Sequence, residues 1–241
     1  ELARRGHPVH LSTTDPAAHL EHALAEEVEG LTVDRIDPAV ETQRYAERVL
    51  ATKGKGLDKA GRRLLKEDLR SPCTEEVAVF HAFSKVVREA ARGFVVLDTA
   101  PTGHTLLLLD QTGAYDREVR RNAAGVPGRV TTPLARLQDP EYTRLLIATL
   151  PETTPVLEAA ALQDDLRRAG IEPYAWVINQ SLAAAGPTDP MLAARARAEI
   201  PMLDAVRTQH AERTFMVPVM AAAPVGSEAL GELVGGVSEV V

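Results

Sequence analysis

The residues best suited to chemistry in this sequence directly follow the apolar run from Phe94 to Leu97. They form the string DTAPTGHTL at residues 98–106. An aspartate at the end of a buried strand can hold a Mg²⁺-bound water in a nucleotide site. Gly103 leaves room for the backbone to approach a γ-phosphate, or to move when that phosphate leaves. A strand-to-helix turn capped by Asp98 would use the same residues, so both interpretations remain open.

A second string of this kind is STTDPAAH at residues 12–19, which also follows an apolar strand. Asp15 could orient a water molecule for in-line attack or join the shell of a Mg²⁺ ion. Equally, Asp15 could cap a helix that has Pro16 at its first position, since both residues are favoured there. The two roles are compatible with each other.

The elements that must position these residues alternate between strands and helices. Short apolar runs predict strands at 8–12, 31–34, 94–98, 145–149, 174–179 and 214–218. The clearest helices are expected at 75–92 and at 155–169, the latter with Pro155 at its first position and Gly170 just past its end. This alternation predicts an α/β fold, a parallel sheet with helices on both faces. Ligands bind such sheets beyond the carboxyl ends of the strands, where both strings lie.

Two regions depart from this rhythm. Residues 1–6 have the pattern of a helix end closed by Gly6, which suggests a chain that begins within a helix, and so an N-terminally truncated domain. Residues 53–73 contain a basic Lys-Gly-Lys-Gly stretch and a charged, weakly helical segment. We expect this region to be a flexible helical insertion in a single domain spanning residues 1–241.

Composition excludes several classes of function. The formal charge of −7 argues against a nucleic-acid partner, because such proteins carry a basic face. The single cysteine, Cys73, cannot form a disulfide within the chain, which favours a cytoplasmic location. No apolar run approaches the length of a membrane span. Any role at a membrane is therefore expected to act through a partner.

The string at 98–106 resembles the signature of the arsenical pump-driving ATPases, the ArsA family. Residues 107–115 and 149–159 are similar to that family as well, and the resemblance extends from about Leu2 to about Leu233. It implies a P-loop NTPase-like fold that uses ATP and Mg²⁺. Family members carry a P-loop with two lysines, which would lie just before Glu1. No such loop occurs in this sequence, so we expect this chain by itself to hydrolyse ATP poorly or not at all.

The resemblance also assigns roles to individual residues. Asp15 would lie in the switch I loop near the attacking water and the metal, and Asp98 would begin the switch II loop. Other residues would transmit the nucleotide state along that loop: Thr99, Gly103 and Thr105. Asn179 would read adenine, although a turn-stabilising role is the alternative. The other side of the base pocket would be formed by Pro218, Val219 and Met220.

A metalloid site is implied by the same family. In the second half of the two-halved pump ATPase, a Cys in a similar segment binds arsenite or antimonite, together with a His and a Ser. The matching residues here are Cys73, His104 and Ser71. A thiolate suits such a soft centre, and the bound metalloid would act as an allosteric activator of ATP hydrolysis. A buried structural thiol is the alternative for Cys73.

The implied partners are a second ATPase half or a homodimer partner, and an integral membrane arsenite pump. The pump would hold this cytoplasmic protein peripherally at the membrane. Two other functions remain open. A tail-anchored membrane-protein targeting ATPase shares the switch loops, but usually has a paired-cysteine zinc motif that one cysteine cannot supply. A non-catalytic partner module would explain the missing P-loop.

Overall fold

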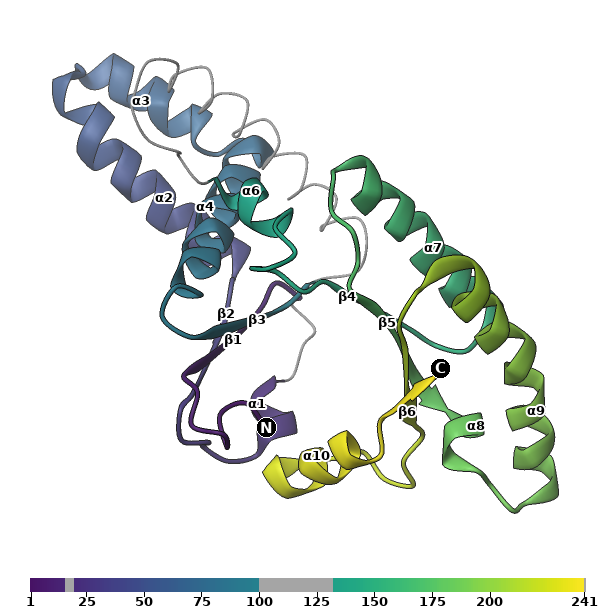
Figure 1. Ribbon diagram of the computed structural model, residues 1–241. Coiled ribbons are helices and arrows are strands. Elements are labelled where there is room, and N and C mark those ends of the chain that lie inside the picture. Colours follow the sequence, from purple (N-terminus) through teal and green to yellow (C-terminus); the bar gives the residue numbers. More distant parts are fainter. Residues whose placement is uncertain (16–19, 100–131, 241) are drawn as a thin grey trace. The chain divides into compact units, whose positions relative to one another are not determined.

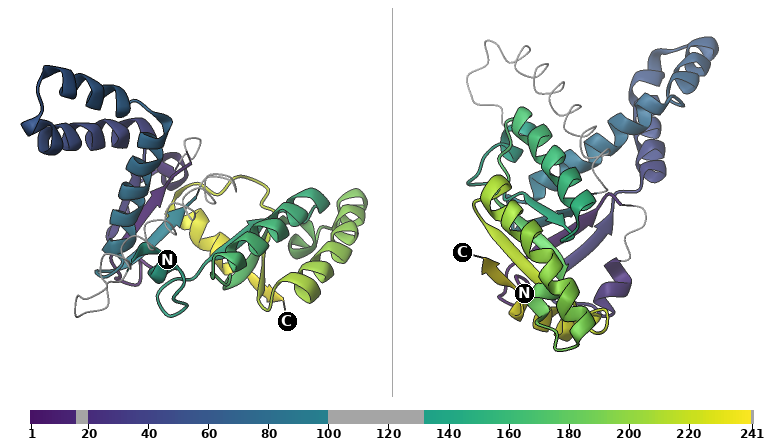
Figure 2. Two further views of the ribbon diagram at one scale, coloured as in Figure 1. Left: turned by 90° about the horizontal axis from the view of Figure 1, so that it is seen from above. Right: turned by 90° about the vertical axis from the view of Figure 1, so that its right-hand side faces the viewer.

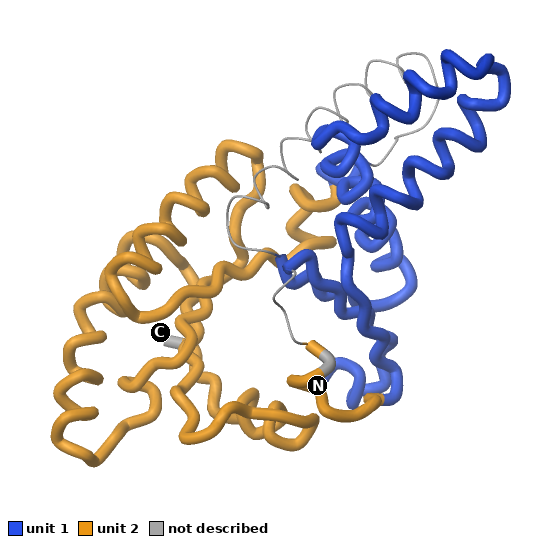
Figure 3. Tube along the Cα trace, turned by 180° about the vertical axis from the view of Figure 1, so that it is seen from behind, with its two compact units in different colours: residues 1–19, 29–135 blue, residues 20–28, 136–241 orange. Residues whose placement is uncertain are grey.

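The computed structural model describes residues 1–15, 20–99 and 132–240 of the chain (Figure 1). The chain divides into two compact units, which are coloured separately in Figure 3. The first unit comprises residues 1–19 and 29–135, and the second comprises residues 20–28 and 136–241. Each unit contains one sheet of its own.

The first unit is built on three parallel strands in the order β2-β1-β3. These strands are β1 (Val9–Thr13), β2 (Leu31–Arg35) and β3 (Phe94–Asp98). The helices of this unit within the described residues are α2 (Pro38–Thr52), the 3₁₀ turn η1 (Lys53–Gly56), α3 (Lys59–Asp68) and α4 (Pro72–Glu89). A short helix, α6 (Pro133–Leu137), lies where the two units meet in sequence. Strand β1 is central, so its two last residues, Ser12 and Thr13, are fully buried.

The core of the first unit comes largely from α4. Its buried side chains include Phe80, Phe83, Val86 and Val87, which recur at helical spacing on one face. Helix α2 packs against α4, and His81 of α4 stacks on Tyr45 of α2 with ring centroids 5.6 Å apart.

Helices α2 and α3 form an antiparallel pair connected by η1, and this pair extends away from the sheet of its unit (Figure 2). Asp37 caps α2 through hydrogen bonds from the amides of Ala39 and Val40, and Asp58 caps α3 through a bond from Gly61. Neither α2 nor α3 has a fully buried residue among those described. Residues 53–73, predicted to be a flexible helical insertion, contain η1, α3 and the first two residues of α4.

The second unit contains a sheet in the order β4-β5-β6-β7. Its strands are β4 (Leu146–Thr149), β5 (Ala175–Ser181), β6 (Thr214–Pro218) and β7 (Ser238–Val240). Its helices are α1 (Leu20–Leu24), α7 (Thr153–Arg168), α8 (Leu182–Ala185), α9 (Pro190–Ala205), the π-helical turn η2 (Val206–His210) and α10 (Gly226–Gly235). The first three strands are parallel, and β7 pairs antiparallel with β6.

A polar network supports the core of the second unit around Trp176, which is 1% exposed. The indole Nε1 of Trp176 donates to Oε1 of Gln163 at 2.6 Å, and Nε2 of Gln163 donates to the carbonyl oxygen of His210 at 2.9 Å. The ring of His210 stacks on the indole with centroids 5.3 Å apart. Since a buried polar group without a partner is costly, these bonds allow Gln163 to lie inside.

The α/β class with parallel strands is confirmed, and the six predicted strands are present within one or two residues. Strand β7 was not predicted. The prediction that Pro155 begins a helix was wrong, because α7 starts two residues earlier, at Thr153. Gly170 follows the end of α7 with a φ of +76°, as a helix-closing glycine does.

The chain start has the hydrogen bonding of a closed helix end. The amide of His7 donates to the carbonyl of Leu2 at 3.2 Å, and that of Gly6 donates to Ala3 at 2.8 Å. Gly6 has a φ of +83°, which glycine adopts without strain. These are the paired bonds of a Schellman motif, as the sequence predicted for Gly6. Within the described residues, no helix is both long and apolar enough to cross a bilayer.

Candidate functional site

The two carboxylates singled out in the sequence lie at the carboxyl ends of neighbouring strands. In the parallel pairing of β1 with β3, Thr13 lies opposite Asp98. The hydroxyl of Thr13 donates to Oδ2 of Asp98 at 3.1 Å and accepts a bond from the amide of Asp15 at 3.0 Å. The amide of Thr14 donates to the carbonyl of Asp98 at 2.9 Å. The segments that begin at Asp15 and Asp98 are therefore joined by hydrogen bonds.

Thr13 makes this connection because of its position in the sheet. It is the last residue of the central strand and is 1% exposed, so its hydroxyl must find partners inside the protein. Both of its hydrogen-bonding roles are used, as donor to one segment and acceptor from the other. Thr13 was not among the residues predicted to form the site. The signal available was a hydroxyl residue that ends an apolar strand.

The strand-end carboxylates have the chemistry required for a magnesium ion with its nucleotide. Asp98 and Thr99 are exposed, and Asp15 is half-buried, so ligands can reach this edge of the sheet. Carboxylate and hydroxyl oxygens are hard donors of the type that Mg²⁺ prefers. The donor set at the ends of β1 and β3 thus fits a Mg²⁺–phosphate group.

In the second unit, the residues expected to bind the base are close to one another. The pairing of β5 with β6 shifts register between Ile178 and Ser181, and Ser181 then pairs with Pro218. The amide of Val219 donates to the carbonyl of Ser181 at 3.1 Å. Asn179 is two residues before Ser181, so the ends of β5 and β6 bring it near the segment from Pro218 to Met220.

The turn that holds Asn179 has unusual backbone geometry. Gln180 has a φ of +57°, which non-glycine residues rarely adopt. Oδ1 of Asn179 accepts a hydrogen bond from the amide of Gln180 at 3.0 Å. This bond matches the turn-stabilising role that was the alternative for Asn179. It leaves the side-chain amide nitrogen of Asn179 as a donor at an exposed position.

A buried glutamate from α9 fixes the same turn. Glu199 is 9% exposed, and its carboxylate accepts bonds from the hydroxyl of Ser181 at 2.9 Å and from the amides of Leu182 at 3.1 Å and Ala183 at 3.0 Å. The Ser181 oxygen in turn accepts from the amide of Ala184 at 3.1 Å. A carboxylate thus satisfies the free amides at the start of α8. Glu199 was not among the predicted site residues either.

The metalloid residues are described only in part. Ser71 immediately precedes α4, and its hydroxyl lies 3.3 Å from that of Thr74. Cys73, in the first turn of α4, is exposed and forms no disulfide, so the alternative of a buried thiol is wrong. The residues that the structure describes include no group of three or more His, Cys, Asp and Glu able to hold a metal ion. His104, Gly103 and Thr105 lie outside the described residues.

Comparison with known proteins gives consistent matches. A family model described as an anion-transporting ATPase of ArsA type matches residues 1–126. An arsenical pump-driving ATPase of Escherichia coli is 60% identical over 233 residues, which cover 97% of this chain. One from Acidiphilium multivorum is 59% identical over 232 residues, 96% of this chain. The chain spans 40% of the length of each of these two relatives.

Proposed function

Because this chain belongs to the ArsA family of anion-transporting ATPases, we propose that it serves in an ATPase that energises the efflux of arsenite or antimonite. In this proposal, ATP hydrolysis is coupled to metalloid binding through the segments that begin at Asp15 and Asp98. The observation that carries the proposal is the Thr13 hydroxyl, which hydrogen-bonds to both segments. A displacement of one segment then strains or breaks a bond to the other.

Several residues of this chain would each have a separate role at the phosphate end of ATP. When bound, Mg²⁺ neutralises charge that develops on the phosphate oxygens. Asp15 would orient the attacking water, and Asp98 would hold a water of the metal shell. Thr13 keeps the Asp98 carboxylate in position by donating to its Oδ2. Thr99, Gly103 and Thr105 would carry the change that follows phosphate release.

The residues that the family resemblance links to adenine belong to the second unit. Asn179 would donate its side-chain amide to a ring nitrogen of adenine, with Pro218, Val219 and Met220 along the other side of the base. This role is supported by the hydrogen bonds that Glu199 accepts from the turn after Asn179, because they hold the backbone next to Asn179 in one conformation. A donor that is already held in position loses less conformational entropy on binding.

The metalloid would be bound by Cys73 with Ser71 and His104, and the thiolate would form the strongest bond. The exposure of Cys73 supports this role, because an external ligand can reach the thiol. One cysteine is too few for a tight site, so the remaining ligands would come from a second ATPase half or a homodimer partner. The membrane pump that the relatives are named for would hold this protein peripherally at the membrane.

The test is ATP hydrolysis by the full-length protein that contains this chain, measured with and without antimonite. We expect antimonite to raise the rate in the wild type and in Glu75→Gln, an exposed control in the same helical turn as Cys73. Cys73→Ser should keep the rate measured without antimonite and lose the stimulation. Asp98→Asn should lower hydrolysis about a hundredfold, which corresponds to ~3 kcal/mol.

Two other results would each overturn part of the proposal. Hydrolysis that is indifferent to antimonite would remove the metalloid coupling and favour a tail-anchored protein targeting ATPase. If Asp98→Asn and the wild type hydrolyse ATP equally, this chain is a non-catalytic partner module.

A further inference from the structure

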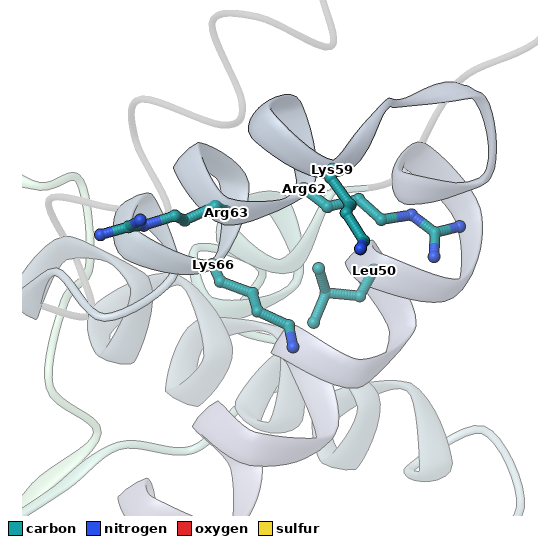
Figure 4. Close-up of a pocket in the computed structure, with 5 residues that line it drawn as sticks. All are labelled: Leu50, Lys59, Arg62, Arg63 and Lys66. Atoms are coloured by element: carbon teal, nitrogen blue, oxygen red, sulfur yellow. The ribbon is translucent and has the colours of Figure 1, made fainter.

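The helical hairpin of α2 and α3 contains a basic pocket. Its volume is about 460 Å³, and it is lined by Leu50 of α2 and by four residues of α3: Lys59, Arg62, Arg63 and Lys66. Figure 4 shows Lys59 and Lys66 beside Leu50, whereas the side chain of Arg63 extends away from it. Residues spaced by three, four and seven positions share one face of a helix, so all four residues lie on the face of α3 that borders the pocket.

The formal charge of the segment around the pocket is opposite in sign to that of the whole chain. Residues 53–70 contain seven Lys and Arg against three Asp and Glu, a formal charge of +4, in a chain whose formal charge is −7. The remaining residues therefore carry −11. A local field of this sign attracts anions although the protein as a whole repels them.

The four cations are poorly neutralised by the protein itself. None of the five residues that line the pocket is acidic. Nε of Arg63 lies 3.6 Å from Oε1 of Glu67. Both side chains are exposed, and an ion pair of this kind contributes little to stability. Arg62 donates to the carbonyl of Gly54 at 2.9 Å, which holds the guanidinium in position without cancelling its charge. Among the described residues, Lys59 and Lys66 have no carboxylate within ion-pair distance.

We propose that this pocket binds a soluble anion that carries two or more linked phosphate groups. Lys and Arg side chains are the usual ligands of phosphate oxygens, and Arg adds paired donors in a fixed geometry. The volume lies in the range of ligand pockets, and four positive charges match the charge of a linear triphosphate. Leu50 is the one apolar residue among the five that line the pocket, and Leu64, the most exposed leucine of α3, does not line it. The pocket therefore offers little of the apolar surface that favours insertion into a lipid surface. This site is separate from the residues proposed to bind ATP and does not depend on that function.

The test is isothermal titration calorimetry with inorganic tripolyphosphate. We expect the wild type to bind, with an affinity that falls as salt is added. The double variant Lys59→Gln/Lys66→Gln should lose at least about tenfold in affinity, because two charged donors are removed. The matched control Lys85→Gln/Arg92→Gln removes two exposed charges of the same unit outside the pocket, and should bind like the wild type. Thermal unfolding followed by circular dichroism checks that both variants are folded.

Three results would overturn the proposal. The wild type could show no binding, or the control could lose as much affinity as the pocket variant, which would make the effect one of overall charge. The third result is binding to phosphatidylglycerol vesicles without binding to tripolyphosphate, which would assign the basic face to a membrane surface.

Discussion

Replacement of Glu199 by alanine tests how strongly a single buried carboxylate holds the turn after β5. The change removes the acceptor for three donors, namely the Ser181 hydroxyl and the amides of Leu182 and Ala183. The Ser181 hydroxyl is fully buried and would lose its acceptor, whereas the two amides are half-buried and would be partly hydrated.

The expected loss can be estimated from these three bonds. We assign ~1 kcal/mol to each half-buried amide and ~1–2 kcal/mol to the buried hydroxyl, a total of about 3–4 kcal/mol in the free energy of unfolding. Glu199→Gln retains one of the two acceptor oxygens and turns the other into a donor that faces donors. We therefore expect it to lose roughly half of that amount, ~2 kcal/mol.

The assay is urea denaturation followed by the fluorescence of Trp176. This residue is the single tryptophan of the chain and is buried in the same unit as Glu199, so its emission reports unfolding of that unit. Arg197→Ala is the matched control, because Arg197 is an exposed residue of the same helix. Its unfolding free energy should remain within ~0.5 kcal/mol of the wild type.

If the unfolding free energies of Glu199→Ala and Arg197→Ala differ by less than about 1 kcal/mol, the carboxylate bonds contribute no more than a surface contact and do not hold the turn. If the proposed role of Asn179 is right, Glu199→Ala should also weaken ATP binding under conditions where the protein remains folded. Stability and nucleotide binding are measured separately, so failure of the second expectation would leave the first intact.

Other perturbations test the remaining unit and its pH response. Thr13→Val removes the hydroxyl but keeps the side-chain volume, and should lower the free energy of unfolding by about 1–3 kcal/mol in urea denaturation followed by circular dichroism. Gly93→Ala would bring a Cβ within 2.4 Å of a backbone carbonyl oxygen and should cost ~1–3 kcal/mol by the same measurement, whereas Gly56→Ala meets open space and should not. Partial desolvation and the nearby Arg48 and Arg88 lower the pKa of His81 below 6.5. A histidine titration followed by NMR should show this lowered pKa rising in Arg48→Gln.

The controls for these changes follow from the same contacts. Thr13→Ser keeps the hydroxyl, so an equal loss in Thr13→Ser and Thr13→Val would mean that packing, not hydrogen bonding, explains the effect. For His81, the folded state binds fewer protons than the unfolded chain between its lowered pKa and 6.5. Its contribution to stability is therefore full above pH 6.5 and falls as the pH drops into that window. The stability of the wild type relative to His81→Gln should decline over the same window, and a constant difference would contradict the assignment.

The strands could be predicted because most of them are continuous apolar runs, which are typical of parallel sheets. Burial on both faces does not follow from such a run, since Phe94 and Val96 of β3 are 46% and 42% exposed. Strand β7 could not be predicted, because it is only three residues long and includes the polar Ser238 and Glu239. It is defined by its antiparallel pairing with β6, which local sequence does not reveal. Helix α7 began earlier than expected because Pro155 is also tolerated in the first turn after N1.

Some residues of the candidate site could likewise be predicted from local sequence, whereas others could not. Asp15 and Asp98 are recognisable as carboxylates that follow apolar strands, and this requires only local sequence. The role of Thr13 depends on the register of β1 against β3, which sets it opposite Asp98. Glu199 lies 18 residues after its partner Ser181, within a helix where an acidic residue is ordinary. Only the packing of α9 against the turn makes that residue distinctive.

The order of the strands determines how the chain would respond to a cut. Consider a single backbone cut between Lys53 and Lys55, which are exposed in the turn at the tip of the hairpin. Cleavage there would separate β1, β2 and α2 from α3, α4 and β3. Yet β1 pairs with β3 from Val9–Phe94 to Thr13–Asp98, and α2 packs against α4, so both contacts cross the cut. The two fragments should remain associated through the sheet and the helix pair, because the central strand comes first in the chain and its outer neighbour comes last. Covalent continuity at the hairpin tip is therefore not what holds this unit together.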